Sequence, residues 1–464
     1  MTPTTPRRTL SLLDSICIVV GTIIGAGVFG TVAKVANLTP NLTMMIGMWV
    51  AAGVIVLIGA ACFIELTTRF PDEAGGDYAY LKKAYGKPIA FMFAWSAFWI
   101  VRPANIGIMA TLFGIYFSQI ITAIPGLSEI PPTILQIVSS ILAIVALTAG
   151  NLVGIKKGKL TQNILTIAKV AGIGLIILLA LTHPLREAAA PVEPVWEVKS
   201  LWLALVFVMF SFGGWNDMAM IANEIRSPEK NLWRCLIFGV GLVTLVYVLF
   251  NIALAVGLGQ SGMAASKAPA IDLVRMALGG EGFFADRAQE LVAALICTSC
   301  LGAVNGMIIT SPRIYYAAGR DYPALGFLAK WNAERGCPWQ AILLQAVVTI
   351  SLILFCLTFK LVAIQIFDVL LVASAPYFWT FLGATTLSLL VFRSREKSKG
   401  THFRLPLFPF EPIFFAIVCV GLTYYSIDHL IEEGHQMIAL AIGGMMLVGV
   451  VLGVVLKTNK EKVD

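Results

Sequence analysis

The stretch Val20-Gly21-Thr22-Ile23-Ile24-Gly25-Ala26-Gly27-Val28-Phe29-Gly30 decides how this chain is built. It lies within an apolar run over residues 10–36, long enough to cross a bilayer, because a spanning helix needs about 20 residues. Four glycines interrupt the run, and each weakens a helix by roughly 1 kcal/mol relative to alanine. Backbone groups freed at membrane depth are tolerated only where they line a cavity or bind something. A broken first helix therefore predicts a binding site.

The composition of the whole chain is that of a membrane protein. Of its 464 residues, 58% are hydrophobic and 13% are charged, whereas soluble domains carry about 25% charged residues. Apolar runs predict one transmembrane domain over residues 1–464 with twelve spanning helices. The runs lie near residues 10–36, 42–68, 86–121, 131–151, 160–182, 199–222, 233–258, 286–312, 338–358, 361–392, 408–430 and 436–456.

The distribution of positive charge predicts the orientation of these helices. Most of the 33 lysines and arginines lie in the two termini and in the alternate loops that share a side with them. Lysine and arginine concentrate in cytoplasmic loops, so both termini are expected in the cytoplasm of a multi-pass protein of the cell (inner) membrane. The net charge of +7 follows from this topology and does not indicate binding to nucleic acid.

A second break is predicted in the sixth span, in the stretch Met209-Phe210-Ser211-Phe212-Gly213-Gly214-Trp215-Asn216-Asp217. Paired interruptions in two halves are typical of transporters built from inverted repeats. We expect an all-α membrane protein with a 5+5 inverted repeat, broken helices 1 and 6, and two further C-terminal helices. The repeats would cover residues 10–182 and 199–392, followed by helices 11 and 12 over residues 408–456.

Several stretches, taken together, resemble the L-type amino acid transporter family of the amino acid–polyamine–organocation superfamily. The pattern over residues 21–27, with Phe29, is similar to the helix 1 signature of the superfamily. The other similar stretches are, in chain order, Gly75-Gly76-Asp77-Tyr78-Ala79-Tyr80, Arg102-Pro103, Gly213-Gly214-Trp215-Asn216, Asn223-Glu224-Ile225, residues 227–232 and residues 299–306. The resemblance therefore covers most of the chain.

This resemblance implies a Na⁺-independent amino acid exchanger that works by alternating access. Animal members bond to a heavy subunit through a cysteine between helices 3 and 4, and the loop over residues 123–131 contains none. A stand-alone prokaryotic transporter is therefore expected, whose partners are small-molecule amino acid substrates and the lipid bilayer. No cofactor or metal is expected, because the single CxxC, Cys297 to Cys300, lies in an apolar helix and is better explained by packing.

Backbone groups at the two breaks are predicted to bind the cargo. Helix N-termini present free N–H groups and C-termini free carbonyls. The N–H groups at Gly25-Ala26-Gly27 are expected to bind a carboxylate, as anions sit at helix N-termini. Carbonyls at Thr22-Ile23 and over residues 210–213 are expected to bind the ammonium. The resemblance places the backbone contacts at Ile23, Ala26, Gly27, Phe210 and Gly213.

Three side chains are candidates for the walls of the pocket. Phe210 adjoins the second break and is expected to close over bound substrate from outside, the alternative being an ordinary core or lipid-facing phenylalanine. Trp379 in helix 10 and Asn216 after the second break are candidates for contact with the side chain of the substrate.

Lys169 is the main candidate for a coupling residue. A lone lysine at mid-membrane costs about 2.5–3.5 kcal/mol, so partners are expected. The resemblance implies that its ammonium occupies the place of Na⁺ in sodium-coupled relatives, bonded to helix 1 carbonyls and to hydroxyls such as that of Ser299. The alternatives are snorkelling to the surface and a role in proton coupling.

Two further charged residues lie in predicted spans. Arg102 precedes Pro103, which frees a backbone carbonyl, and the arginine is expected to support the helix by binding such carbonyls, the alternative being contact with the substrate. Asp217 follows the second break and is expected to act as a helix N-cap, the alternative being contact with a cationic substrate.

The chain is predicted to exchange neutral L-amino acids. The alternatives are proton-coupled uptake, exchange that includes cationic amino acids through Asp217, and a nutrient sensor that keeps the pocket without transporting. A membrane enzyme would need a catalytic cluster at membrane depth, but the four histidines lie at or beyond span ends, so an enzyme is not expected. They are His183, His402, His429 and His435.

Overall fold

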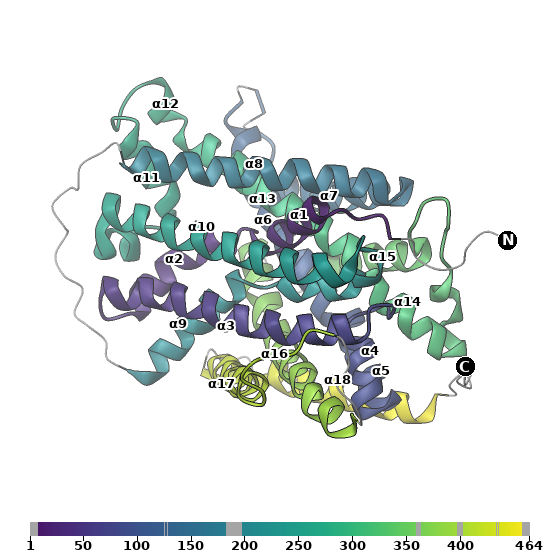
Figure 1. The fold of residues 1–464 in the computed structure, drawn as a ribbon. Coiled ribbons are helices and arrows are strands. Elements are labelled where there is room, and N and C mark those ends of the chain that lie inside the picture. Colours follow the sequence, from purple (N-terminus) through teal and green to yellow (C-terminus); the bar gives the residue numbers. More distant parts are fainter. Residues whose placement is uncertain are drawn as a thin grey trace.

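The computed structural model describes residues 8–124, 126–127, 129–181, 197–358, 363–396, 402–432, 434 and 436–456. Within these ranges eleven helices are long and apolar enough to cross a membrane, and one bent helix pair forms a twelfth span. The predicted twelve-helix, all-α membrane fold is confirmed. Figure 1 shows a bundle whose helices run mostly lengthwise, with both described chain ends at one end of the bundle, which we call the terminal end.

The first five spans contain two irregular helices. The helices are α1 (Leu12–Ile23), α2 (Gly27–Leu38), α3 (Leu42–Arg69), α4 (Asp77–Tyr85), α5 (Lys87–Ser96), the π-helix η1 (Ala97–Val101), α6 (Arg102–Thr122), α7 (Pro132–Val153) and α8 (Ile155–Leu181). The first span is the bent pair α1 and α2, and the third runs from α5 through η1 to α6. The short helix α4 adds no span and lies toward the terminal end (Figure 1).

The next spans begin with the second interrupted helix. They comprise α9 (Val198–Ser211), the 3₁₀-helix η2 (Trp215–Glu224), α10 (Pro228–Ala265), α11 (Pro269–Ala277), α12 (Phe283–Asp286), α13 (Ala288–Thr310), α14 (Pro312–Asp321), η3 (Pro323–Ala329), α15 (Trp339–Thr358), α16 (Ala363–Arg395), α17 (Phe410–Glu432) and α18 (Gln436–Val455). In Figure 1, α17 and α18 lie along the opposite edge of the bundle from α8. The division into inverted repeats stays a prediction.

The first break has the position that its glycines predict. Helix α1 ends at Ile23, α2 begins at Gly27, and the two halves are bent by 45°. A Cβ atom at Gly25 would lie 2.8 Å from the Met109 sulfur, and one at Gly27 would lie 3.1 Å from the Ser211 Cα. Both glycines are therefore needed because neighbouring helices approach the broken backbone closely.

The second break is followed by a 3₁₀-helix and not by the expected α-helix. Helix α9 ends at Ser211, and Gly214 has a φ of 102°, a conformation that glycine adopts readily. A 3₁₀-helix of ten residues is long, since runs beyond three or four are uncommon and often mark a hinge or strain.

The two broken helices are joined at the terminal end. Leu10 pairs with Ile225 in a parallel bridge, and the Arg226 N–H donates to the Leu10 carbonyl at 2.9 Å. Asp14 in α1 pairs with Lys159 of α8 at 2.8 Å. The start of the first span is thus tied both to the segment that follows η2 and to α8.

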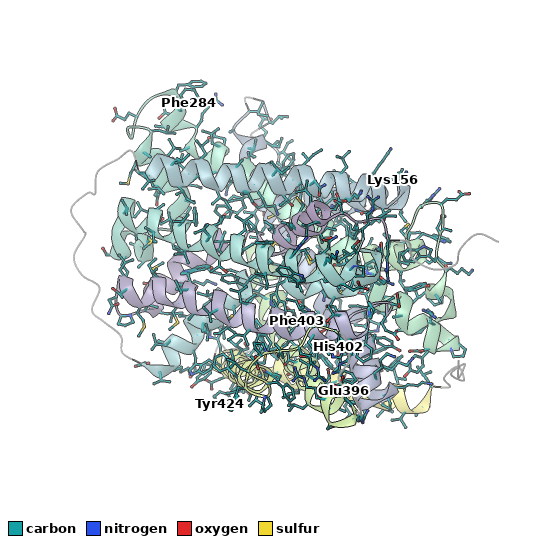
Figure 2. The ribbon with its side chains drawn as sticks, in the orientation of Figure 1. Lys156, Phe284, Glu396, His402, Phe403 and Tyr424 are labelled. Atoms are coloured by element: carbon teal, nitrogen blue, oxygen red, sulfur yellow. The ribbon has the colours of Figure 1, made fainter. Side chains whose placement is uncertain are left out.

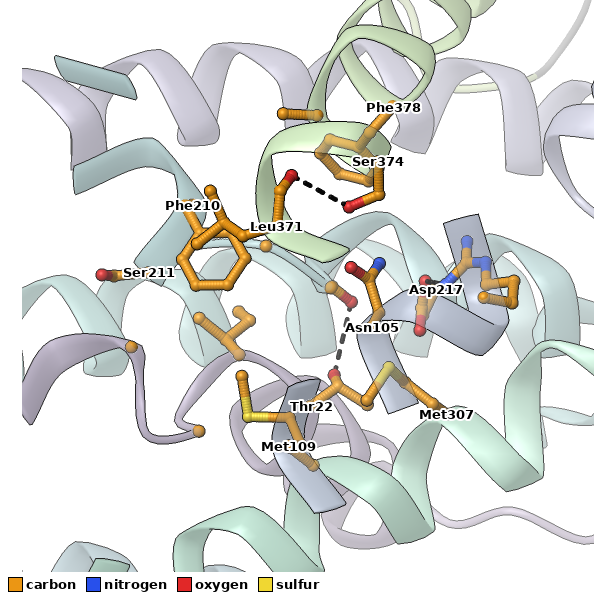
Figure 3. Close-up of a pocket in the computed structure, with 18 of the residues that line it drawn as sticks. Thr22, Asn105, Met109, Phe210, Ser211, Asp217, Met307, Leu371, Ser374 and Phe378 are labelled. Carbon is orange, nitrogen blue, oxygen red and sulfur yellow. Dashed lines mark hydrogen bonds and ion pairs between the residues drawn. The ribbon is translucent and has the colours of Figure 1, made fainter. Parts of the chain in front are cut away.

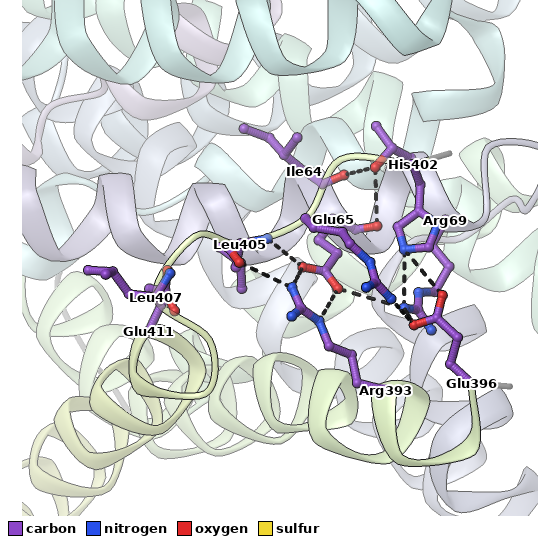
Figure 4. Close-up of polar contacts among 11 residues, drawn as sticks. Ile64, Glu65, Arg69, Arg393, Glu396, His402, Leu405, Leu407 and Glu411 are labelled. Carbon is purple, nitrogen blue, oxygen red and sulfur yellow. Dashed lines mark hydrogen bonds and ion pairs between the residues drawn. The ribbon is translucent and has the colours of Figure 1, made fainter. Parts of the chain in front are cut away.

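A buried carboxylate, Glu65 of α3, links α3 to the end of α16 (Figure 4). It accepts hydrogen bonds from Arg393 Nε at 2.8 Å and Nη2 at 2.6 Å, and from the Leu405 N–H at 2.8 Å. Beside this pair, burial and the guanidinium of Arg69 hold the pKa of His402 below its usual value. The imidazole is therefore neutral near pH 7, and its Nε2 accepts from Arg69 at 3.1 Å.

Glu65→Gln is expected to destabilise the protein by roughly 3–5 kcal/mol, because breaking a buried ion pair leaves an uncompensated charge. The measurement is thermal unfolding of purified protein in detergent. The control is Glu73→Gln, because Glu73 pairs with Lys83 at 2.9 Å with both side chains well exposed. Such a surface pair contributes about 0–1 kcal/mol, so equal shifts in the two variants would contradict the role given to Glu65.

The side chains in Figure 2 distinguish the two ends of the bundle. Lys156, Glu396 and His402 lie in the half nearer the terminal end, and Phe284 lies toward the other end. The loops at the terminal end carry the concentration of basic residues noted in the sequence.

Candidate functional site

The main cavity lies between the two breaks (Figure 3). The space that it encloses, open solvent included, is about 820 Å³. Helices α1, α6, α9, α13 and α16 all contribute to its walls. The lining residues are Thr22, Ile23, Gly25, Gly27, Arg102, Asn105, Met109, Val206, Phe210, Ser211, Gly213, Gly214, Asp217, Ala303, Met307, Leu371, Ser374, Ala375, Phe378 and Trp379.

Backbone from both breaks reaches this cavity. Gly27 starts α2, and the N–H groups in the first turn of a helix have no partner inside that helix. Ile23 ends α1, and Gly213 follows the end of α9. The cavity therefore faces a helix N-terminus beside two helix C-termini, which is the arrangement that a carboxylate and an ammonium together require. Ala26, also predicted as a contact, is not among the lining residues.

Tyr247 of α10 joins the two breaks, and sequence reasoning missed it. Its buried hydroxyl lies 3.1 Å from the Ile23 carbonyl oxygen and 3.0 Å from that of Ser211. A hydroxyl has one hydrogen to donate, so it serves the two carbonyls in turn. Tyr247 therefore holds the ends of α1 and α9 at a fixed separation, which positions the carbonyls expected to bind the ammonium.

Lys169 of α8 is wholly buried and bonded to backbone from two other helices. Its Nζ donates to the carbonyls of Gly21 at 2.9 Å, Ile24 at 2.6 Å and Ser299 at 3.0 Å. The snorkelling alternative is wrong, since the ammonium does not reach the surface. Ser299 contributes its carbonyl and not its hydroxyl, which has no hydrogen-bond partner among the described residues.

The three predicted pocket side chains do not all reach the main cavity. Phe210 and Trp379 line it, and Figure 3 shows Phe210 beside Leu371 of α16. Asn216 lies outside it and points instead toward Asp77, to which its Nδ2 donates at 3.4 Å. The residue follows the break by only two positions, but the first turn of η2 carries its side chain into a neighbouring cavity.

The expectations for Arg102 and Asp217 are corrected by a contact between them. Arg102 Nη1 bonds Asp217 Oδ1 at 2.7 Å, and the Thr310 hydroxyl donates to Asp217 Oδ2 at 3.1 Å. Asp217 is therefore an ion-pair partner and not an N-cap, a position that Gly214 occupies without a side-chain bond. Arg102 binds this carboxylate in place of a carbonyl freed by Pro103. Each of the two carboxylate oxygens of Asp217 therefore has a hydrogen-bond partner in the protein.

Sequence reasoning also missed several side chains in the cavity wall. Asn105 and Met109 follow Arg102 at helical spacing on α6, so a pattern search starting from that arginine would have found them. Leu371, Ser374 and Phe378 share this spacing with one another on α16 and are one position out of step with Trp379, so a search from Trp379 would not have found them. Nothing in the apolar context of Met307 on α13 distinguishes it from a core methionine.

Comparison with known proteins agrees with this geometry. The family model described as amino acid permease matches residues 10–450. The chain belongs to the amino acid permease family. Among curated relatives, this permease is 29% identical to the mouse (Mus musculus) b(0,+)-type amino acid transporter 1, over 90% of the chain and 82% of the relative.

Two further relatives confirm the resemblance to L-type transporters. The permease is 27% identical to the serine/threonine exchanger SteT of Bacillus subtilis (strain 168), with 88% of each chain covered. It is 28% identical to the mouse (Mus musculus) large neutral amino acids transporter small subunit 2, over 75% of this chain and 65% of the relative. The permease is thus a multi-pass membrane protein of a family of amino acid transporters.

Proposed function

We propose that this permease exchanges neutral L-amino acids across the cell membrane by alternating access, independently of Na⁺. The observation that carries the proposal is the Lys169 ammonium, which bonds Gly21 and Ile24 on α1 and Ser299 on α13. The Lys169 ammonium is a positive charge fixed to the protein, and it links helices that a mobile cation would otherwise link. Relatives described as exchangers and neutral amino acid transporters support the same reading.

The preference for neutral cargo follows from charge balance in the cavity wall. Asp217 is compensated by Arg102 and Thr310, so a lysine or arginine side chain would bring a charge without a partner into a largely apolar cavity. This argument favours neutral substrates over the cationic alternative.

The proposal includes orientation and assembly. The terminal end would face the cytoplasm, because it carries most of the lysine and arginine residues in loops. The permease would act without a disulfide-linked heavy subunit, since its 123–131 loop has no cysteine.

Counterflow in proteoliposomes tests the proposal. Vesicles preloaded with L-serine are expected to take up labelled L-serine at least about tenfold faster than empty vesicles, since an exchanger returns loaded. Replacing external Na⁺ with choline should leave the rate unchanged. Protein-free vesicles are the control. Equal uptake into loaded and empty vesicles, strong Na⁺ dependence, or acceleration by a proton gradient would each overturn exchange of this kind.

A further inference from the structure

A second, smaller cavity adjoins the main one. The space that it encloses, open solvent included, is about 320 Å³. Arg102 and Phe378 line both cavities, so the two share a wall. Six of its ten lining residues lie on α16 and η1. Two others, Asp77 and Phe93, belong to α4 and α5, which lie toward the terminal end in Figure 1. The second cavity therefore extends from the main cavity toward the terminal end.

The polar part of this cavity has one negative and one positive group, which together complement the two charges of a zwitterion. Asp77 supplies a carboxylate, Arg102 a guanidinium and Asn216 an amide. All three side chains are at least nine-tenths buried. The remaining wall is apolar and largely aromatic, which strengthens charge-assisted hydrogen bonds by excluding water.

Two polar atoms in the wall have no hydrogen-bond partner among the described residues. They are Arg102 Nε, a donor, and Asn216 Oδ1, an acceptor. Buried polar atoms are nearly always satisfied, so a donor and an acceptor left open beside the same cavity point to a polar occupant. The ion pair with Asp217 uses Nη1 of Arg102, which leaves Nε for that occupant.

We propose that this second cavity is a transient binding site for the amino acid zwitterion, which the cargo occupies between the main cavity and the terminal end. The cargo's ammonium would bind Asp77 and the Asn216 Oδ1 atom, and its carboxylate would accept from Arg102 Nε. The inference rests on the proposed function, because the same cargo must enter both sites. Arg102 would thus contact the amino acid on its way while remaining paired with Asp217.

Binding stoichiometry tests the second site. Purified permease is equilibrated with labelled L-serine over concentrations that saturate binding, and two molecules per protein are expected, the second bound more weakly. Ala97→Leu should lower the number to one, because Ala97 lines only the second cavity and the larger side chain fills it. Ala94→Leu is the matched control, since Ala94 is also buried, lies one turn earlier and lines neither cavity.

A second variant keeps the test independent of packing. Asp77→Asn nearly preserves shape but removes the charge, and it should weaken the second binding step at least tenfold with less change in the first. One serine per wild-type protein with counterflow intact would overturn the second site alone. Two serines in Ala97→Leu would do the same. No serine binding and no counterflow in the wild type would overturn the proposed function together with the second site.

Discussion

Gly213→Val is expected to reduce amino acid exchange at least about 100-fold, equivalent to a loss of about 2.7 kcal/mol. A Cβ atom at Gly213 would meet one neighbour within 4 Å, the Phe210 carbonyl oxygen at 3.1 Å. The branched methyl groups would extend into the main cavity, where the cargo's ammonium is expected. The measurement is counterflow of L-serine, with thermal unfolding recorded on the same preparations.

Gly30→Val is the control for this variant. Gly30 belongs to the same glycine motif as the first break, and a Cβ atom there would meet nothing within 4 Å. It should retain exchange and unfold at nearly the same temperature as Gly213→Val. Normal exchange by the folded Gly213→Val protein would show that the second break does not bind the cargo.

Lys169→Met is expected to lower exchange at least about tenfold, a change worth roughly 1.4 kcal/mol. Methionine keeps much of the length and apolar volume but cannot donate to the carbonyls of Gly21, Ile24 and Ser299. Three buried acceptors would lose a charged donor, so the broken helix would no longer be tied to α8 and α13. Counterflow and serine binding should fall together.

Two matched variants separate this role from a general effect of altering α8. Lys156→Met removes an exposed lysine from the same helix and should leave exchange unchanged. Gly302→Ala places a Cβ atom 2.5 Å from Lys169 Nζ, and should impair exchange by displacing the ammonium. Wild-type rates in Lys169→Met would contradict the tether and return the residue to a packing role.

The spans and the first break were predictable because their signals are local. Apolar runs set the span lengths, and the glycines around Gly25 and Gly27 mark where the backbone must allow close approach. Lys169 was conspicuous because a lone charge in an apolar helix demands partners. The partners of Lys169 were only partly predictable. The Ser299 hydroxyl is the group that the sequence suggests, but the Ser299 backbone carbonyl binds the ammonium, because a sequence shows side chains and not backbone contacts.

The errors have a common physical origin in long-range contacts. Asp217 was assigned an N-cap role from its position after glycines, yet its partner Arg102 is 115 residues away in the chain. The sequence around Tyr247 does not reveal its role, because tyrosines are common in apolar helices. Only the structure shows its hydroxyl between the C-terminal ends of α1 and α9. Gly214, which precedes η2, lies so close to Thr22 that a Cβ atom there would be 3.2 Å from the Thr22 carbonyl oxygen, a long-range contact that local sequence does not show.

The buried ammonium of Lys169 also has an electrical consequence. A mobile cation that crosses the membrane with cargo gains or loses about 2.3 kcal/mol for each 100 mV of potential. Lys169 is bonded to the helix walls, so its charge stays with the protein when the cargo leaves. One-for-one exchange of zwitterions should then carry no current, and voltage should supply no driving force. The gradient of one amino acid would be set only by the gradient of the other. This permease would therefore couple two amino acid gradients and would not act as a pump.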